Sequence, residues 1–118
     1  MTTDAELYSA LKYRVDVDEC GTRVHYNAQG YLHCEEGPAI EYTSGCKAWY
    51  QNGLRHRIDG PAIEYTSGCK EWYQNGLRHR IDGPAIEWPD GSVEWWLNGK
   101  RCTKQNYHAQ LKTLGQTP

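Results

Sequence analysis

The chain has 118 residues, a length typical of a single domain. Apolar residues make up 38% of it and the mean hydropathy is −0.86, so a thick two-layer core is not expected. The 5 tryptophans and 9 tyrosines exclude a solvated, disordered chain. The formal net charge is −2, so the chain lacks the overall positive charge that is typical of DNA-binding domains. No apolar run approaches the ~20 residues of a membrane span.

The N-terminus and the cysteines indicate a cytoplasmic location. The first residues, MTTDAELYSALKYR, lack the basic and apolar regions of a signal peptide. The 5 cysteines are odd in number and show no C-x-x-C spacing. In the cytoplasm we expect them to be reduced thiols.

Residues 1–18 form the first predicted segment, which caps the array that follows. Residues 3–6, TDAE, have the pattern of a helix capping box, and the apolar residues Leu7, Ala10 and Leu11 come next. We expect a short helix here that seals one open end of a repeat array.

Residues 19–102 are built from a unit of 23 residues and form one domain. The tripeptide Gly-Pro-Ala recurs with this period, at positions 37–39, 60–62 and 83–85. The two central copies are identical except at one position, which is Ala48 in the first and Glu71 in the second. A more divergent copy follows them, and a decayed copy precedes them. Such near-identity indicates a recent duplication.

Each unit is predicted to form antiparallel strands. In the second central copy, 62–65 and 69–74 are rich in Ile, Tyr and Trp and flank a Thr-Ser-Gly turn. The dipeptide Asn75-Gly76 then favours a tight hairpin turn, with 77–81 extended beyond it. Because one such unit cannot bury a face, the units are expected to stack as an all-β, single-layer antiparallel β-meander. A β-helix with one coil per unit is the alternative.

Two aromatic ladders follow from the period. We align one of them as Tyr26, Trp49, Trp72 and Trp95, and the other as Tyr50, Tyr73 and Trp96. Neighbouring residues on a strand point to opposite faces, so one ladder is expected to form a thin core and the other a binding surface. The sequence leaves open which face is exposed. The competing interpretation is that cap helices and cross-strand packing cover both.

Residues 103–118 are predicted to form a C-terminal capping helix and a tail. Thr103 is the expected N-cap, and Tyr107, Leu111 and Leu114 form one apolar stripe. Gly115 is expected to stop the helix.

The unit resembles MORN-type repeats. The shared pattern is W-Y-x-N-G-x-x-H-R-x-D-G-P-A followed by a second Ser-Gly or Asp-Gly turn, and it covers residues 22–102. It is most similar to divergent variants found in bacterial and bacteriophage proteins. The resemblance implies an elongated antiparallel β-meander that binds proteins or forms dimers, with no catalytic residues to carry over. The segments 57–59 and 80–82 depart from the eukaryotic pattern, so no membrane binding is expected.

One column of the repeat has the composition of a metal site, namely His33, His56, His79 and Cys102. On the hairpin interpretation, equivalent residues lie two strand spacings apart, roughly 10 Å, whereas zinc ligands sit about 2.0–2.3 Å from the metal. A repeated packing or hydrogen-bonding role is therefore expected, and no metal.

Arginines recur beside each Asn-Gly turn, close to the rings. They offer a basic stripe for a phosphate backbone or an acidic protein patch. The alternative is that they form cross-strand ion pairs with Glu41, Glu64, Glu87 and Glu94.

We expect a non-enzymatic macromolecule-binding protein without cofactor. The bacteriophage-type repeat suggests a phage or mobile-element accessory protein that binds and blocks a host protein complex, such as a defence system, in the host cytoplasm. A structural or self-assembling β-repeat protein, for instance a homodimer, is one alternative, and a nucleic-acid-binding module is another. The candidate partner-binding residues are Trp49, Tyr50, Arg55, Arg57, Trp72, Tyr73, Arg78, Arg80, Trp95, Trp96 and Arg101.

Overall fold

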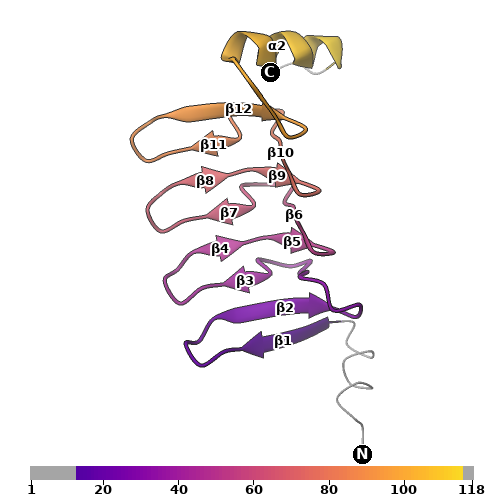
Figure 1. Cartoon of the computed structure of the whole chain (residues 1–118), viewed down its shortest axis with the longest axis vertical. Coiled ribbons are helices and arrows are strands. Elements are labelled where there is room, and N and C mark those ends of the chain that lie inside the picture. The colour runs from indigo at the N-terminus through magenta and orange to yellow at the C-terminus, as the bar shows by residue number, and fades with distance from the viewer. Residues whose placement is uncertain (1–12, 116–118) are drawn as a thin grey trace, which may run out of the picture.

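The computed structural model describes residues 13–115 as a long, thin molecule of 60 × 31 × 18 Å (Figure 1). Strands cross its long axis one after another, and one helix lies across the C-terminal end (Figure 1). In chain order the elements are β1 (Tyr13–Val17), β2 (Arg23–Asn27), β3 (Ile40–Glu41), β4 (Lys47–Ala48), β5 (Tyr50–Gln51), β6 (Leu54–Arg55), β7 (Ile63–Glu64), β8 (Lys70–Glu71), β9 (Tyr73–Gln74), β10 (Leu77–Arg78), β11 (Ile86–Glu87), β12 (Val93–Leu97), β13 (Lys100–Cys102) and α2 (Lys104–Thr113). The N-terminal helix that the sequence predicts lies outside the described residues.

The expected antiparallel meander is confirmed. An open nine-stranded sheet runs in the order β1-β2-β3-β4-β7-β8-β11-β12-β13, and the pairs β5-β6 and β9-β10 form separate small hairpins along one side (Figure 1). The sheet begins with β1, inside the segment that the sequence assigns to the N-terminal cap. Units stack as antiparallel hairpins, so the β-helix alternative is wrong.

One predicted strand is interrupted. The sequence favours a continuous strand over 69–74, but the structure divides it into β8 and β9 at Trp72. The amide of Trp72 still bonds to the main sheet, at 2.7 Å from the carbonyl of Ala85. Tyr73 pairs with Arg78 of its own hairpin instead. The chain therefore changes partner at the tryptophan, and each of the two central units contributes to two sheets.

The Asn-Gly turns hold neighbouring units together. Asn75 and Gly76 have φ angles of 51° and 82°, the left-handed pair that a type I′ turn requires. The amide of Gly76 donates to the carbonyl of Arg55, 2.8 Å away in the preceding hairpin. A Cβ at Gly76 would lie 3.3 Å from Cδ2 of Leu54, so glycine also permits this close stacking.

The first copy of the repeat corrects our alignment of one ladder. The amides of His25 and Trp49 make equivalent bonds of 2.7 Å to the alanine of the next Gly-Pro-Ala motif. Tyr26 pairs across its turn as Tyr50 does. His25, and not Tyr26, therefore stands in the tryptophan column. The reason is that the turn before Gly30 is one residue longer than the later turns.

The helix α2 closes the C-terminal end as predicted. The hydroxyl of Thr103 caps it by accepting from the amide of Asn106 at 3.1 Å. Tyr107 and Leu111 are buried against Leu97. The prediction that Leu114 continues the apolar stripe was wrong, because Leu114 is the C-cap residue of the helix and is 60% exposed. No helix within residues 13–115 is long and apolar enough to cross a membrane.

Candidate binding surfaces

The two faces of the sheet carry different rings. Side chains alternate along a strand, so Trp49 and Tyr50 point to opposite faces. The tryptophan face carries Trp49, Trp72 and Trp95. The tyrosine face carries Tyr42, Tyr50, Tyr65, Tyr73, Trp88 and Trp96. Among the described residues, no second layer packs on the tyrosine face, and α2 packs mainly on β12 and β13 at the end of the sheet.

On the tryptophan face, an arginine of each central unit stacks on a tryptophan and pairs with a glutamate. We call this set of contacts the arginine clamp. The guanidinium of Arg57 stacks 3.8 Å from the ring centroid of Trp49. Its Nη1 donates to Oε2 of Glu64 at 2.9 Å and to the carbonyl of Pro61 at 3.1 Å. A Cβ at Gly60 would lie 2.9 Å from the guanidinium carbon, so the Gly-Pro-Ala motif leaves room for the clamp.

The next unit repeats the clamp. Arg80 stacks 3.8 Å from the ring centroid of Trp72 and donates to Glu87 at 2.8 Å. The ion-pair alternative is thus confirmed for both clamp arginines, whose side chains are 22% and 19% exposed. Four of the candidate residues belong to this framework, namely Trp49, Arg57, Trp72 and Arg80.

Trp95 lies beneath the C-terminal helix. Its ring centroid is 4.8 Å from that of Tyr107 and 5.6 Å from that of His108. Lys104 also lies over it, with Nζ 5.9 Å from the centroid. The hydroxyl of Tyr107 donates to the carbonyl of Arg80 at 2.6 Å, which ties the helix to the preceding unit. This candidate residue therefore serves as an anchor for the cap.

The other six candidates form a ring–arginine ladder on the tyrosine face, in the order Tyr50, Arg55, Tyr73, Arg78, Trp96 and Arg101. Arg55 lies 5.3 Å from the ring centroid of Tyr73, and Arg78 lies 5.0 Å from that of Trp96. Guanidinium groups therefore occupy the ring faces, and Tyr73 is buried. The ladder presents arginine and ring edges to a partner and not a row of bare rings.

Carboxylates lie beneath the ladder in two units. Oε1 of Glu71 accepts from the hydroxyl of Tyr73 at 3.0 Å and from Nη2 of Arg78 at 3.3 Å. In the following unit Glu94 accepts from the indole of Trp96 at 2.9 Å. These acids neutralise the arginines beside them.

The first central unit has no such carboxylate, because Ala48 stands in its place. A cavity of about 220 Å³ opens there, and we call it the Ala48 hollow. Its lining consists of Tyr42, Ser44, Cys46, Ala48, Tyr50, Arg55, Ile63 and Tyr65. The Nε of Arg55 donates to the hydroxyl of Tyr50 at 3.3 Å, and no carboxylate of residues 13–115 forms an ion pair with Arg55.

Protonation states in and around the hollow are set by burial and hydrogen bonding. The hydrogen bond to Tyr50 raises the pKa of Arg55, so this arginine is fully charged. Burial raises the pKa of Tyr65 to about 12, so its hydroxyl stays neutral at neutral pH. The hollow is therefore positively charged and rich in hydroxyl groups.

Cys46 and Cys69 occupy the same position in the two central units, but their pKa values are shifted in opposite directions. The hydroxyl of Ser44 lowers the pKa of Cys46, whose sulfur also lies 3.8 Å from Oγ1 of Thr66. Burial, followed by the charge of Glu71, raises the pKa of Cys69. The five cysteines are free thiols in the structure.

Three exposed rings form an outer aromatic column that the sequence pattern did not single out. Tyr42, Tyr65 and Trp88 are 44%, 40% and 36% exposed and recur at the repeat period. Each precedes the turn between the two strands of its unit. The signal was present in the recurring Ile-Glu-Tyr and Ile-Glu-Trp triplets, which we read as strand formers only.

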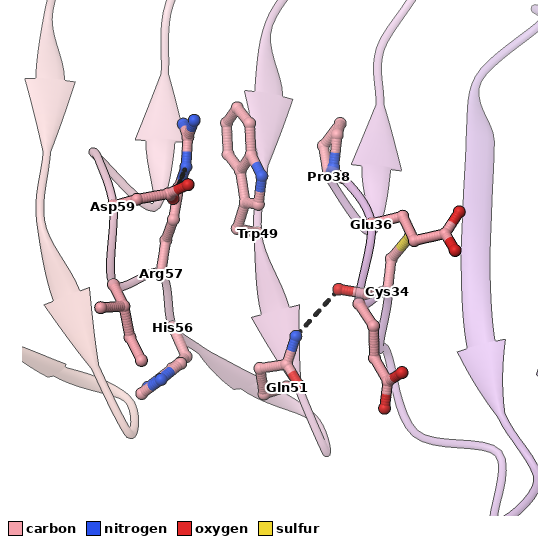
Figure 2. Close-up of a pocket in the computed structure, with 11 residues that line it drawn as sticks. Cys34, Glu36, Pro38, Trp49, Gln51, His56, Arg57 and Asp59 are labelled. Carbon is pink, nitrogen blue, oxygen red and sulfur yellow. Dashed lines mark hydrogen bonds and ion pairs between the residues drawn. The ribbon is translucent and has the colours of Figure 1, made fainter.

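A larger pocket, the loop pocket, opens on the tryptophan face between 34–38 and 56–59 (Figure 2). Its volume is about 750 Å³. Figure 2 shows Trp49, one of the lining residues, between Arg57 and Pro38. Cys34 stands here where later units have the clamp arginine, and its carbonyl accepts from Nε2 of Gln51 at 2.8 Å. Without that arginine, the first loop leaves the pocket open.

The histidine column has the hydrogen-bonding role that we predicted. Nδ1 of His56 accepts from the amide of Asn75 at 2.9 Å, and His33 and His79 make the same bond to the next turn at 3.0 Å. Burial lowers the pKa of His79, which favours the neutral ring that this bond needs. Cys102 departs from the column, because its thiol donates to the carbonyl of Lys100. Residues 13–115 contain no cluster of three side chains suited to a metal ion.

No family model matches the chain, and neither a curated protein nor a solved structure does. Function is therefore inferred from these surfaces and from the repeat pattern.

Proposed function

We propose that the protein is a non-enzymatic binding module that holds a protein partner against its tyrosine face. The observation that supports this best is the outer aromatic column of Tyr42, Tyr65 and Trp88, which stays exposed along an uncovered sheet. Tyrosine, tryptophan and arginine are the residue types that dominate binding energy at protein interfaces. Here the repeat places them side by side.

A rigid sheet makes such a surface effective. The stacked turns and arginine clamps hold the rings at fixed intervals, so little side-chain entropy is lost on binding. An elongated face of repeated units also suits an extended partner surface.

The charge pattern favours a protein over a nucleic acid. A phosphate backbone is bound by arginines that can replace its counterions. Arg57, Arg78, Arg80 and Arg101 are already paired with carboxylates of the chain. Rings beside mostly neutralised arginines suit a mixed polar and apolar protein patch.

The resemblance to MORN-type repeats of bacteriophage proteins supports a narrower form of this proposal. In that form the protein acts in the host cytoplasm, where it occupies the surface of a host complex, such as a defence system, and blocks it. Self-assembly through the same face is the competing outcome of the experiment that follows.

The experiment is a pull-down from nuclease-treated bacterial lysate with a matched pair of variants. The column variant carries Tyr42→Ser, Tyr65→Ser and Trp88→Ser. The control variant carries Leu54→Ser, Ile58→Ser and Ile81→Ser, which remove exposed apolar groups elsewhere.

We expect one stoichiometric partner that the control variant retains and the column variant loses. Equal capture by both variants would contradict the proposal. Recovery of the protein alone, with a larger species in light scattering, would establish self-assembly instead.

A further inference from the structure

The duplication provides a matched comparison inside one molecule. The two central units differ only at Ala48 and Glu71, so their backbones, rings and arginines are otherwise the same. In the second unit the carboxylate of Glu71 receives hydrogen bonds from Tyr73 and from Arg78. Within the two units themselves, this carboxylate is the one difference between the two sites on the tyrosine face.

The first unit keeps the donors and lacks the acceptor. Tyr50 and Arg55 occupy the positions of Tyr73 and Arg78, and the Nε of Arg55 donates to the hydroxyl of Tyr50 at 3.3 Å. Tyr50 and Arg55 line a hollow of about 220 Å³. Ala48 forms part of its lining.

We propose that the Ala48 hollow binds a carboxylate, supplied by a glutamate or aspartate side chain of the protein partner. The geometry of the second unit supports this choice, because a carboxylate already satisfies the same two donors there. Charge complementarity points the same way, since Arg55 has no carboxylate partner within residues 13–115. The source of the carboxylate rests on the proposed function, whereas the site itself does not.

The surroundings favour an inserted side chain. Tyr42 and Tyr65, two members of the outer aromatic column, also line the hollow. Arg55 is itself exposed, so an incoming carboxylate can reach its guanidinium and form a charge-assisted hydrogen bond. An acidic side chain that projects from a partner resting on the column would therefore end at Arg55.

The test is a titration followed by nuclear magnetic resonance, with the blocked amino acid N-acetyl-glutamate amide as the probe. N-acetyl-glutamine amide, which has the same shape without the charge, is the control ligand. Two charge-assisted hydrogen bonds support a dissociation constant on the order of 10 mM. We expect saturable shifts at the amide of Ala48 and at the Nε–H of Arg55.

Two variants make the site assignment specific. In Ala48→Glu the new side chain fills the hollow, so the probe-dependent shifts at Arg55 are expected to fall at least tenfold. In Glu71→Ala a second hollow opens, so equivalent shifts are expected at Tyr73 and Arg78. If Glu71→Ala does not fold, the comparison of the native protein with Ala48→Glu still decides the assignment.

The proposal is overturned by equal shifts in the native protein and in Ala48→Glu, by equal shifts with the glutamine analogue, or by no saturable shift up to about 100 mM probe. Failure of the proposed function has a different signature. If the probe binds as expected while the column variant keeps its partner in the pull-down, the carboxylate site stands and the proposed interface falls.

Discussion

Removal of one clamp arginine is expected to destabilise the protein substantially. In Arg80→Ala the guanidinium is lost from its position 3.8 Å from the ring centroid of Trp72. Its bonds to Asp82 at 2.8 Å, to the carbonyl of Pro84 at 3.1 Å and to Glu87 at 2.8 Å are lost as well. The substitution therefore removes one stacking contact, two ion pairs and one hydrogen bond to a backbone carbonyl.

The magnitude follows from these contacts. Stacking on the indole contributes about 1 kcal/mol and the bond to the Pro84 carbonyl about 1 kcal/mol. The two ion pairs add about 1 kcal/mol together, because the carboxylates of Asp82 and Glu87 are 79% and 38% exposed. We therefore expect the free energy of unfolding to fall by about 3 kcal/mol in Arg80→Ala. Arg80→Lys keeps the charge but not the planar set of donors, and a loss of about 2 kcal/mol is expected.

Urea unfolding followed by tryptophan fluorescence measures these values. Arg55→Ala is the matched control, because Arg55 has no carboxylate partner in the described residues, and a loss below about 1 kcal/mol is expected. A loss in Arg80→Ala no larger than that of the control would refute the clamp. The sequence alone predicts that a Trp72→Ala, Arg80→Glu double variant abolishes binding without unfolding. The clamp makes it unsuitable, since both residues support the fold.

Three further predictions concern the duplicated units and the histidine column. Ala48→Glu is expected to raise the unfolding free energy by about 1 kcal/mol and Glu71→Ala to lower it by a similar amount, and thermal melts that show no difference would contradict the matched roles of the two sites. Because the pKa of Cys46 is lowered and that of Cys69 is raised, iodoacetamide at mildly alkaline pH is expected to label Cys46 faster, and equal rates by peptide mass spectrometry would count against this. Burial lowers the pKa of His79 in the folded state, so the unfolded chain takes up the proton first on acidification. Stability is therefore expected to fall as pH drops from about 7 through the ordinary histidine pKa near 6.5, and less so in His79→Gln, which urea midpoints at several pH values will show.

The sequence was sufficient for those parts of the fold that depend on local, repeated signals. The Gly-Pro-Ala period predicted the stacked units, and Asn75-Gly76 predicted the tight turn because few other dipeptides adopt two left-handed φ angles. Thr103 predicted the start of the C-terminal helix for a similar reason, since its hydroxyl caps a free amide.

The candidate site was harder to predict, because the sequence does not say which partner an arginine chooses. Arg78 and Arg80 lie two residues apart in one unit, yet Arg80 clamps Trp72 and Arg78 lies between rings of the ladder. The sequence shows that Ala48 in the first central unit corresponds to Glu71 in the second. Only the structure shows which hydrogen-bond donors surround each of these two positions.

The register of the first unit depended on a loop length. One extra residue before Gly30 moves His25 into the tryptophan column, and an alignment on the glycines alone cannot detect the shift. Hydrogen bonds across the sheet were needed to find it.

Photo-crosslinking from the outer aromatic column tests the central claim most directly. A benzoyl-phenylalanine placed at Tyr65 lies on the tyrosine face, and the same residue placed at Ile58, which is 81% exposed, serves as the control on the opposite loops. After irradiation in bacterial cells, we predict one dominant adduct with a different protein from position 65 and none from position 58. Adducts from position 58 with the same protein, or adducts of the chain with itself alone, would contradict the claim that the tyrosine face binds a protein partner.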